Sequence, residues 1–192
     1  NDLNKVKNKL EIKLSNLSNN KEDLKKLKNE NRVLRDNYEG GVHISFGMTT
    51  KLEEEEIVKL FEKKNQAHRL VLYACTSGYP VPFDDVCLLE IVRLRETFID
   101  RVDKIGFSGH HHGIAVDIAA YTLGAEWFER HFTLDRTFKG TDQVFSLEPT
   151  GMKKLARDLR ATKKALTYKS EDILDIEKPN GGYEKYKQEW IQ

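Results

Sequence analysis

The sequence has no long hydrophobic run and almost no net charge. None of its apolar stretches approaches the roughly 20 residues that a membrane-spanning helix needs, and 32 basic residues against 31 acidic ones leave a formal net charge of +1. Neither the basic surplus typical of nucleic-acid binding nor a basic surface for acidic lipids is therefore indicated. We expect a soluble, cytoplasmic protein with no nucleic-acid partner and no membrane partner.

Cysteine is scarce as well. The chain has two, Cys75 in a predicted strand and Cys87 in a predicted helix. In a reducing compartment such residues are more often free than bridged, so we expect two free, buried thiols and no disulfide.

The first 36 residues contain no aromatic side chain and are rich in Lys and Asn. Leucines recur at every seventh position from Leu3 to Leu24, which is typical of a coiled coil, whereas Lys13 and Asn20 interrupt the companion seam. A solitary surface helix or a loosely ordered arm explains the pattern equally well. Residues 1–36 are predicted to form a helical arm, with these alternatives open.

The segment 37–168 alternates short apolar runs with amphipathic stretches, the pattern of consecutive βα units around a parallel sheet. We expect strands at 43–46, 70–75, 104–107 and 126–132. The helices that follow them should begin near residues 50, 84, 113 and 149. Residues 169–192 are predicted to be a charged tail.

Local sequence features support these helices. Thr50 and Glu53 are spaced as a capping box, Gly124 is placed to end the third helix in the left-handed conformation, and Pro149 suits a first helical turn. The inward faces should carry Leu88, Ile91 and Val92 in the second helix, and Ile114, Ile118 and Ala119 in the third.

Polar side chains gather at the carboxyl ends of the predicted strands, where parallel α/β folds bind ligands. They are Ser45, Ser77, Tyr79, Ser108, His110, His131 and Asp142. Two histidines delivered by neighbouring strand ends can hold one metal ion.

Six short strings carry a resemblance to a known family. They are SFGM at 45–48, CTSGYPVP at 75–82, IGFSGH at 105–110, LGA at 123–125, ERHFTLD at 129–135, and GTD at 140–142 with SLEP at 146–149. With these strings in the family's order, the segment from about Gly41 to Leu166 resembles the sialic acid (N-acetylneuraminate) synthases. These transferases form a carbon–carbon bond between phosphoenolpyruvate and an N-acylmannosamine-type sugar, such as N-acetylmannosamine, and release phosphate.

The resemblance implies an α/β fold of the (β/α)8 TIM-barrel type, of which this chain holds only strands five to eight. Nothing before Gly41 resembles the strands that supply lysines and carboxylates to the complete site. We therefore expect a fragment of a longer enzyme or an altered gene product, with little or no turnover by this chain alone. A complementing chain, a second half-barrel in a homo-oligomer, or the helical arm could cover the open sheet.

For the cofactor, the resemblance implies that His110 and His131 coordinate Mn2+ or Mg2+, with oxygen from water and substrate in the remaining positions. A closed zinc site would want four protein ligands, often thiolates, and the cysteines are not placed for that. In the run from His110 to His112, position favours His110 as the ligand.

For the substrates, the resemblance implies that Ser45 and Ser108 donate hydroxyls to phosphoenolpyruvate, and that Ser77, Tyr79 and Asp142 contact the acceptor sugar. The family often has asparagine at position 77, and many relatives have aspartate at position 109, where this chain has glycine. Asp142 could instead cap a turn. The rival interpretation is a non-catalytic assembly protein that oligomerises through its arm and keeps a degenerate barrel half.

Overall fold

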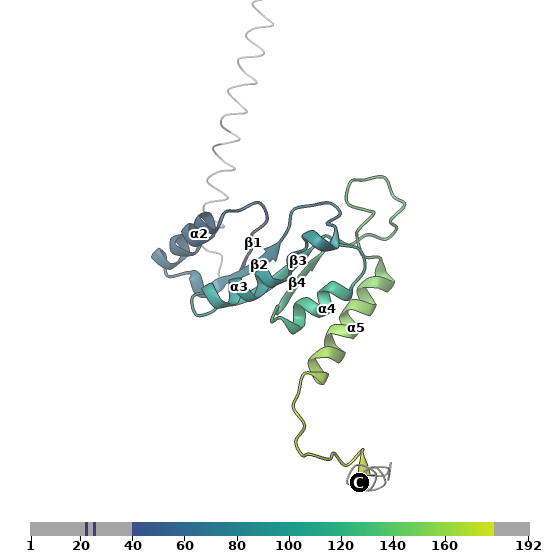
Figure 1. The fold of residues 1–192 in the computed structure, drawn as a ribbon. Helices are drawn as coiled ribbons and strands as arrows, with labels where there is room; N and C mark the ends of the chain where they lie inside the picture. The colour runs from purple at the N-terminus through teal and green to yellow at the C-terminus, as the bar shows by residue number, and fades with distance from the viewer. Residues whose placement is uncertain (1–21, 23–24, 26–39, 179–192) are drawn as a thin grey trace, which may run out of the picture. The chain divides into compact units, whose positions relative to one another are not determined.

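The computed structural model describes residues 22, 25 and 40–178. Its centre is a four-stranded parallel sheet in which the strands follow one another in chain order (Figure 1). The strands are β1 Val42–Ser45, β2 Leu70–Cys75, β3 Lys104–Gly109 and β4 Trp127–Arg130. The predicted α/β class and the parallel, half-barrel sheet are confirmed. The predicted coiled-coil arm lies, apart from Glu22 and Lys25, outside the described residues.

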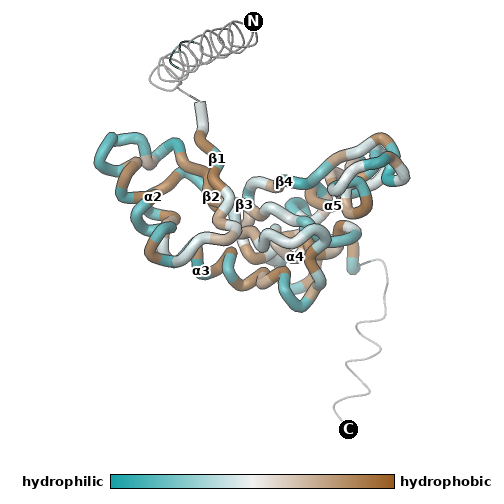
Figure 2. The backbone as a smooth tube through the Cα atoms, turned by 90° about the horizontal axis from the view of Figure 1, so that it is seen from above, coloured by the Kyte–Doolittle hydropathy of each residue, from teal (hydrophilic) through white to brown (hydrophobic). Residues whose placement is uncertain are grey.

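Between residues 40 and 178, four α-helices and two short 3-10 helices connect and follow the strands. They are α2 Lys51–Lys63, η1 Ala67–Arg69, η2 Phe83–Asp85, α3 Leu89–Phe98, α4 Ala115–Thr122 and α5 Pro149–Ala165. Helix α3 packs against β2 and β3, and α4 packs against β3 and α5, so the helices cover one face of the sheet (Figures 1 and 2). No helix among the described residues is both long and apolar enough to cross a membrane.

The two faces of the sheet differ because side chains alternate along a strand. The face under the helices is apolar, and Leu72, Ile105 and Phe107 belong to one hydrophobic core there. On the other face, His43 Nδ1 and the Tyr73 hydroxyl share a hydrogen bond of 2.7 Å. Trp127 on that face remains 48% exposed, so no described element covers it.

The predicted helix-end features are present. The Thr50 hydroxyl accepts a hydrogen bond from the Glu53 backbone N–H, and the Glu53 carboxylate accepts one from the Thr50 N–H. Hydrogen bonds from the Thr50 N–H and hydroxyl to the Glu53 carboxylate hold the pKa of Glu53 below its ordinary value. Gly124 follows α4 with φ +101°, and Pro149 is in the first turn of α5. The capping prediction is confirmed at these positions.

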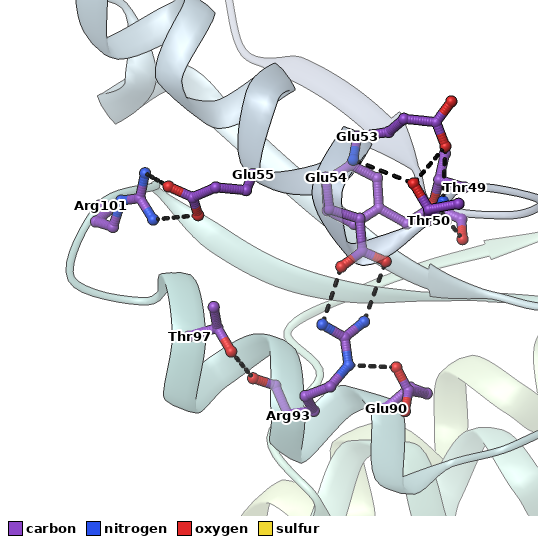
Figure 3. A network of polar contacts seen from close by, with 10 residues as sticks. Thr49, Thr50, Glu53, Glu54, Glu55, Glu90, Arg93, Thr97 and Arg101 are labelled. Carbon is purple, nitrogen blue, oxygen red and sulfur yellow. Dashed lines mark hydrogen bonds and ion pairs between the residues drawn. The ribbon is translucent and has the colours of Figure 1, made fainter.

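Ion pairs attach α2 to the segment containing α3 (Figure 3). The Arg93 guanidinium donates to both oxygens of Glu54, at 2.9 and 3.1 Å, and the Glu54 residue is only 4% exposed. Just beyond α3, Arg101 donates to the carboxylates of Glu55 and Glu62. Two arginine forks thus fix the orientation of α2 beside its neighbour.

The predicted start of the second helix near residue 84 was wrong. Residues Phe83–Asp85 form a separate 3-10 turn, and α3 begins at Leu89. Cys87 adopts φ +53° between them, a left-handed conformation through which an α-helix cannot continue. Both cysteines are free, as predicted, but Cys87 is exposed rather than buried, and Cys75 is only partly buried.

The inward face of α4 also differs from the prediction. Ile114, Ile118 and Ala119 are only partly buried, whereas Asp117 and Ala120 are fully enclosed. A sequence pattern based on hydrophobicity places an aspartate outside. Here the Asp117 carboxylate is accommodated inside because the Arg130 guanidinium forms an ion pair with it.

Candidate functional site

A cavity of about 190 Å³ opens at the carboxyl ends of the four strands. It is lined by Ser45, Gly47, Cys75, Ser77, Tyr79, Ser108, His110, Glu129 and His131. Six of the seven residues singled out from the sequence are in this set. Parallel strands bring their carboxyl ends to one edge, which is why residues so far apart in sequence meet here.

The His110 and His131 imidazoles lie next to each other in this cavity. Their ring centroids are 5.2 Å apart with the planes near perpendicular. Tyr79 packs against both, at 4.6 Å from His110 and 6.1 Å from His131. His110 Nδ1 lies 3.1 Å from the Thr76 carbonyl oxygen, so it carries the proton and donates to that oxygen. This tautomer leaves the Nε2 lone pair of His110 available to a ligand.

Phe145 forms a buried support for these rings and was not anticipated from the sequence. It is 2% exposed, and its ring lies 4.9 Å from His131, 6.0 Å from His110 and 5.7 Å from Tyr79. The Leu147 N–H donates to the His131 carbonyl at 2.8 Å, which returns the loop after β4 to the site. The position of Phe145 depends on this backbone contact between distant parts of the loop, so the sequence alone does not indicate its role.

The structure separates the three consecutive histidines. Alternation along β3 and its extension places Ser108 and His110 at the cavity. His111 is 0% exposed and hydrogen-bonds to Asp117 of α4, on the helix-covered side. His112 is exposed. Of the three, His110 is the one that lines the cavity.

Glu129 also lines the cavity and was missed as a site residue. The Ser45 hydroxyl donates to Glu129 Oε2 at 3.3 Å, which connects the two edge strands β1 and β4 across the site. A signal existed in the sequence, because Glu129 precedes His131 by two residues in an extended segment and must share its face.

Asp142 lies beside the cavity rather than in its wall. Its Oδ2 is 3.7 Å from His131 Nδ1, too long for a hydrogen bond but close enough for an ion pair if His131 is protonated. Its Oδ1 accepts a hydrogen bond from the Thr141 hydroxyl at 2.9 Å. The structure therefore places Asp142 beside His131, one of the two histidines predicted to bind a metal ion.

The cavity wall contains one carboxylate, Glu129, and neither lysine nor arginine. Burial raises the pKa of the Cys75 thiol, although hydrogen bonds with Ser108 and Ser77 oppose the shift. Burial also raises the pKa of Tyr73, and the negative charge of Glu129 adds to that effect. An anionic ligand would need positive charge from a cation or from groups outside this wall.

The donor set fits an open metal site. Within residues 40–178, no group of three or more His, Cys, Asp or Glu side chains is placed to hold a metal ion. The cavity wall does offer two neighbouring imidazoles, those of His110 and His131. Catalytic sites leave positions for water or substrate, unlike closed structural sites. The bond from His110 Nδ1 to a backbone carbonyl is the outer contact that typically orients a metal-bound imidazole.

Comparison with known proteins gives consistent matches. The profile of the NeuB family matches residues 16–171. Human N-acetylneuraminate-9-phosphate synthase is 37% identical over 134 residues, covering 70% of this chain and 36% of that protein. The N,N'-diacetyllegionaminic acid synthase of Campylobacter jejuni is 39% identical over 125 residues, covering 64% of this chain and 36% of that protein.

A solved structure agrees with these sequence matches. The sialic acid synthetase of Leptospira borgpetersenii superimposes with a TM-score of 0.63 at 30% identity, covering 79% of this chain and 50% of that one. The chain thus spans about a third of the length of the curated relatives that it matches.

Proposed function

Because this chain belongs to the NeuB family, we propose that it provides half of a synthase active site. The reaction is the condensation of phosphoenolpyruvate with an N-acylmannosamine-type aldose to give a nonulosonic acid and phosphate. Relatives named as synthases of N-acetylneuraminate 9-phosphate and of N,N'-diacetyllegionaminic acid support this class of reaction. The observation that carries the proposal is the meeting of His110 and His131 in one cavity.

We propose that His110 and His131 hold Mn2+ or Mg2+. A bound cation supplies Lewis-acid chemistry, since it stabilises negative charge that develops on the carbonyl oxygen of the acceptor sugar. The hydrogen bond from His110 to the Thr76 carbonyl fixes that ring before any ligand arrives. Phe145 and Tyr79 limit the movement of both imidazoles by packing against them.

The hydroxyls of Ser45 and Ser108 are proposed to donate to the phosphate and carboxylate of phosphoenolpyruvate. Both line the cavity. Glu129 accepts from Ser45 and so can hold that hydroxyl in one orientation until a substrate oxygen replaces the carboxylate as its acceptor. The carboxylate also repels an anion, so the cation's charge is needed to make phosphoenolpyruvate binding favourable.

The acceptor sugar is assigned to the outer part of the cavity, beside Ser77, Tyr79 and Asp142. Tyr79 is 54% exposed while its ring contacts both histidines, so part of this side chain is open to a sugar. Asp142 Oδ2 lies 3.7 Å from His131 Nδ1 and can offer a carboxylate oxygen to a sugar hydroxyl.

Further polypeptide is proposed to complete the site. Strands β1 and β4 each have one neighbour in the described sheet, and Trp127 is exposed on the uncovered face. A complementing chain, or a second copy in a homo-oligomer, would pair with these edges and bring the cationic groups that the cavity wall lacks.

Calorimetric titration with Mn2+ tests the proposal. The chain should bind Mn2+, and His110→Ala and His131→Ala should each abolish binding because two imidazoles are the only protein ligands proposed. His112→Ala is the matched control, since this exposed neighbour is outside the cavity wall. Unchanged Mn2+ affinity in both cavity variants would remove the basis for the assignment.

A further inference from the structure

A buried charged cluster lies on the opposite side of the sheet from the cavity. Arg130, the last residue of β4, forms an ion pair with Asp117 of α4, and His111 Nε2 lies 3.2 Å from the same Asp117 Oδ2. The side chains of His111 and Asp117 are 0% exposed and that of Arg130 is 2% exposed. Burying charges costs free energy that hydrophobic residues of similar volume would avoid, so the cluster calls for a reason beyond stability.

The cluster contacts the backbone that carries the two cavity histidines. Arg130 Nη2 donates to the His111 carbonyl at 2.7 Å, and Nη1 donates to the Gly113 carbonyl at 2.9 Å. His111 directly follows His110, and Arg130 directly precedes His131. The Arg130 guanidinium therefore links the backbone next to His110 to the strand end that carries His131.

Alternation explains how this is possible without entering the cavity. Glu129 and His131 face the cavity, so Arg130 between them faces the helices. On the neighbouring strand, Ser108 and His110 face the cavity while His111 faces the helices. The two cavity histidines and the cluster of Arg130, Asp117 and His111 thus lie on opposite faces of the same strand ends.

We propose that Arg130, with Asp117 and His111, is a positioning cluster that fixes the spacing of the His110 and His131 rings from behind the sheet. The expected effect on cation affinity rests on the proposed function, whereas the effect on the spacing of the two rings is independent of it. None of the three lines the cavity, so they are positioning residues and not catalytic ones. Losing a hydrogen bond made directly to a metal-bound imidazole typically lowers metal affinity about 10- to 100-fold, and Arg130 acts one step further out, through the backbone.

The Arg130 fork is the part to test. Arg130→Met keeps most of the volume but removes the bonds that Arg130 donates to Asp117 and to the two carbonyls. Arg130→Lys keeps the charge opposite Asp117, yet a single ammonium lacks the planar fork that serves three acceptors at once. Arg93→Met is the matched control, because Arg93 also forks onto an enclosed carboxylate, Glu54, but between α2 and α3.

Two measurements distinguish positioning from stability. The first is NMR of the imidazole ring protons of His110 and His131 in the metal-free protein. Rings whose centroids are 5.2 Å apart shift each other's resonances, so the signals report their relative placement. The second is Mn2+ affinity by calorimetry. Melting temperatures show whether a change merely follows lost stability.

We expect Arg130→Met to displace both ring signals and to weaken Mn2+ binding about 10-fold, the lower end of the range for direct partners of a metal-bound imidazole. Arg130→Lys should do the same to a smaller degree, and Arg93→Met should lower the melting temperature with neither change. If the unaltered chain fails to bind Mn2+, the metal assignment fails, while the ring signals still decide the positioning. If Arg130→Met does not fold, the ring signals of Arg130→Lys decide whether the cluster positions the two histidines. Ring signals in the folded Arg130 variants that match those of the unaltered chain overturn the inference.

Discussion

Adding one methyl group at Gly109 is a sharp test of how the strand end of β3 is built. The Phe107 and His111 rings stack on the helix-covered side, with centroids 5.8 Å apart. Gly109 lies between them in the sequence, and a Cβ there would be 2.8 Å from the nearest carbon of each ring. Since carbon atoms pack at roughly 3.5–4.0 Å, each ring would have to retreat by at least about 0.7 Å.

Both rings are enclosed by the protein, because Phe107 is 2% exposed and His111 is 0% exposed. Overpacking of a filled interior costs about 1–3 kcal/mol, and we expect Gly109→Ala to lower the free energy of unfolding by that amount. Removing the His111 ring should relieve the clash and leave room for Phe107 to move. In a His111→Ala background, the cost of Gly109→Ala should fall by about 1 kcal/mol or more, measured as a coupling energy in a double-mutant cycle.

Gly113 provides the control in the same segment. It has φ +76°, and a Cβ there would meet nothing within 4 Å. Gly113→Ala should cost about 1–2 kcal/mol from backbone strain alone, and this cost should be the same with or without the His111 ring. Urea unfolding of the two cycles gives the comparison. Equal costs of Gly109→Ala in both backgrounds would refute the steric account of this position.

Two further predictions concern ionisation. Hydrogen bonds from Arg101 hold the pKa values of Glu55 and Glu62 below their ordinary value of 4.5, so these carboxylates add stability above that pH and lose it as pH falls through the folded-state values. Arg101→Met should therefore lower the urea midpoint at pH 7, and the difference from the unaltered chain should shrink below about pH 4.5; a difference that grows in acid would contradict the assignment. Iodoacetamide at pH 8 should modify exposed Cys87 much faster than Cys75, whose pKa burial raises, as mass spectrometry of the peptides would reveal.

The sequence was a good guide wherever local chemistry decides the conformation. Thr50 and Glu53 predict a helix start because their hydrogen bonds are made within one turn, and Pro149 does so because its φ suits a first turn. The polar side chains at strand ends met in one cavity because parallel strands must end at one edge.

What the sequence left open was decided by tertiary packing. The left-handed conformation of Cys87 prevents α3 from starting before Leu89, and no neighbouring residue type predicts that conformation. Asp117 of α4 can be buried because Arg130 of β4, distant in sequence, forms an ion pair with it. Phe145 reaches the histidines through a loop that returns to β4, a contact that no sequence periodicity encodes.

The central claim is that His110 and His131 bind the same cation. Pulsed electron paramagnetic resonance of bound Mn2+ counts coordinated nitrogen nuclei directly. With the chain carrying 15N-labelled histidine, the account predicts coupling to two imidazole nitrogens, and loss of the bound Mn2+ signal when either residue is replaced by alanine. A bound Mn2+ with no histidine nitrogen in its coordination sphere would contradict it.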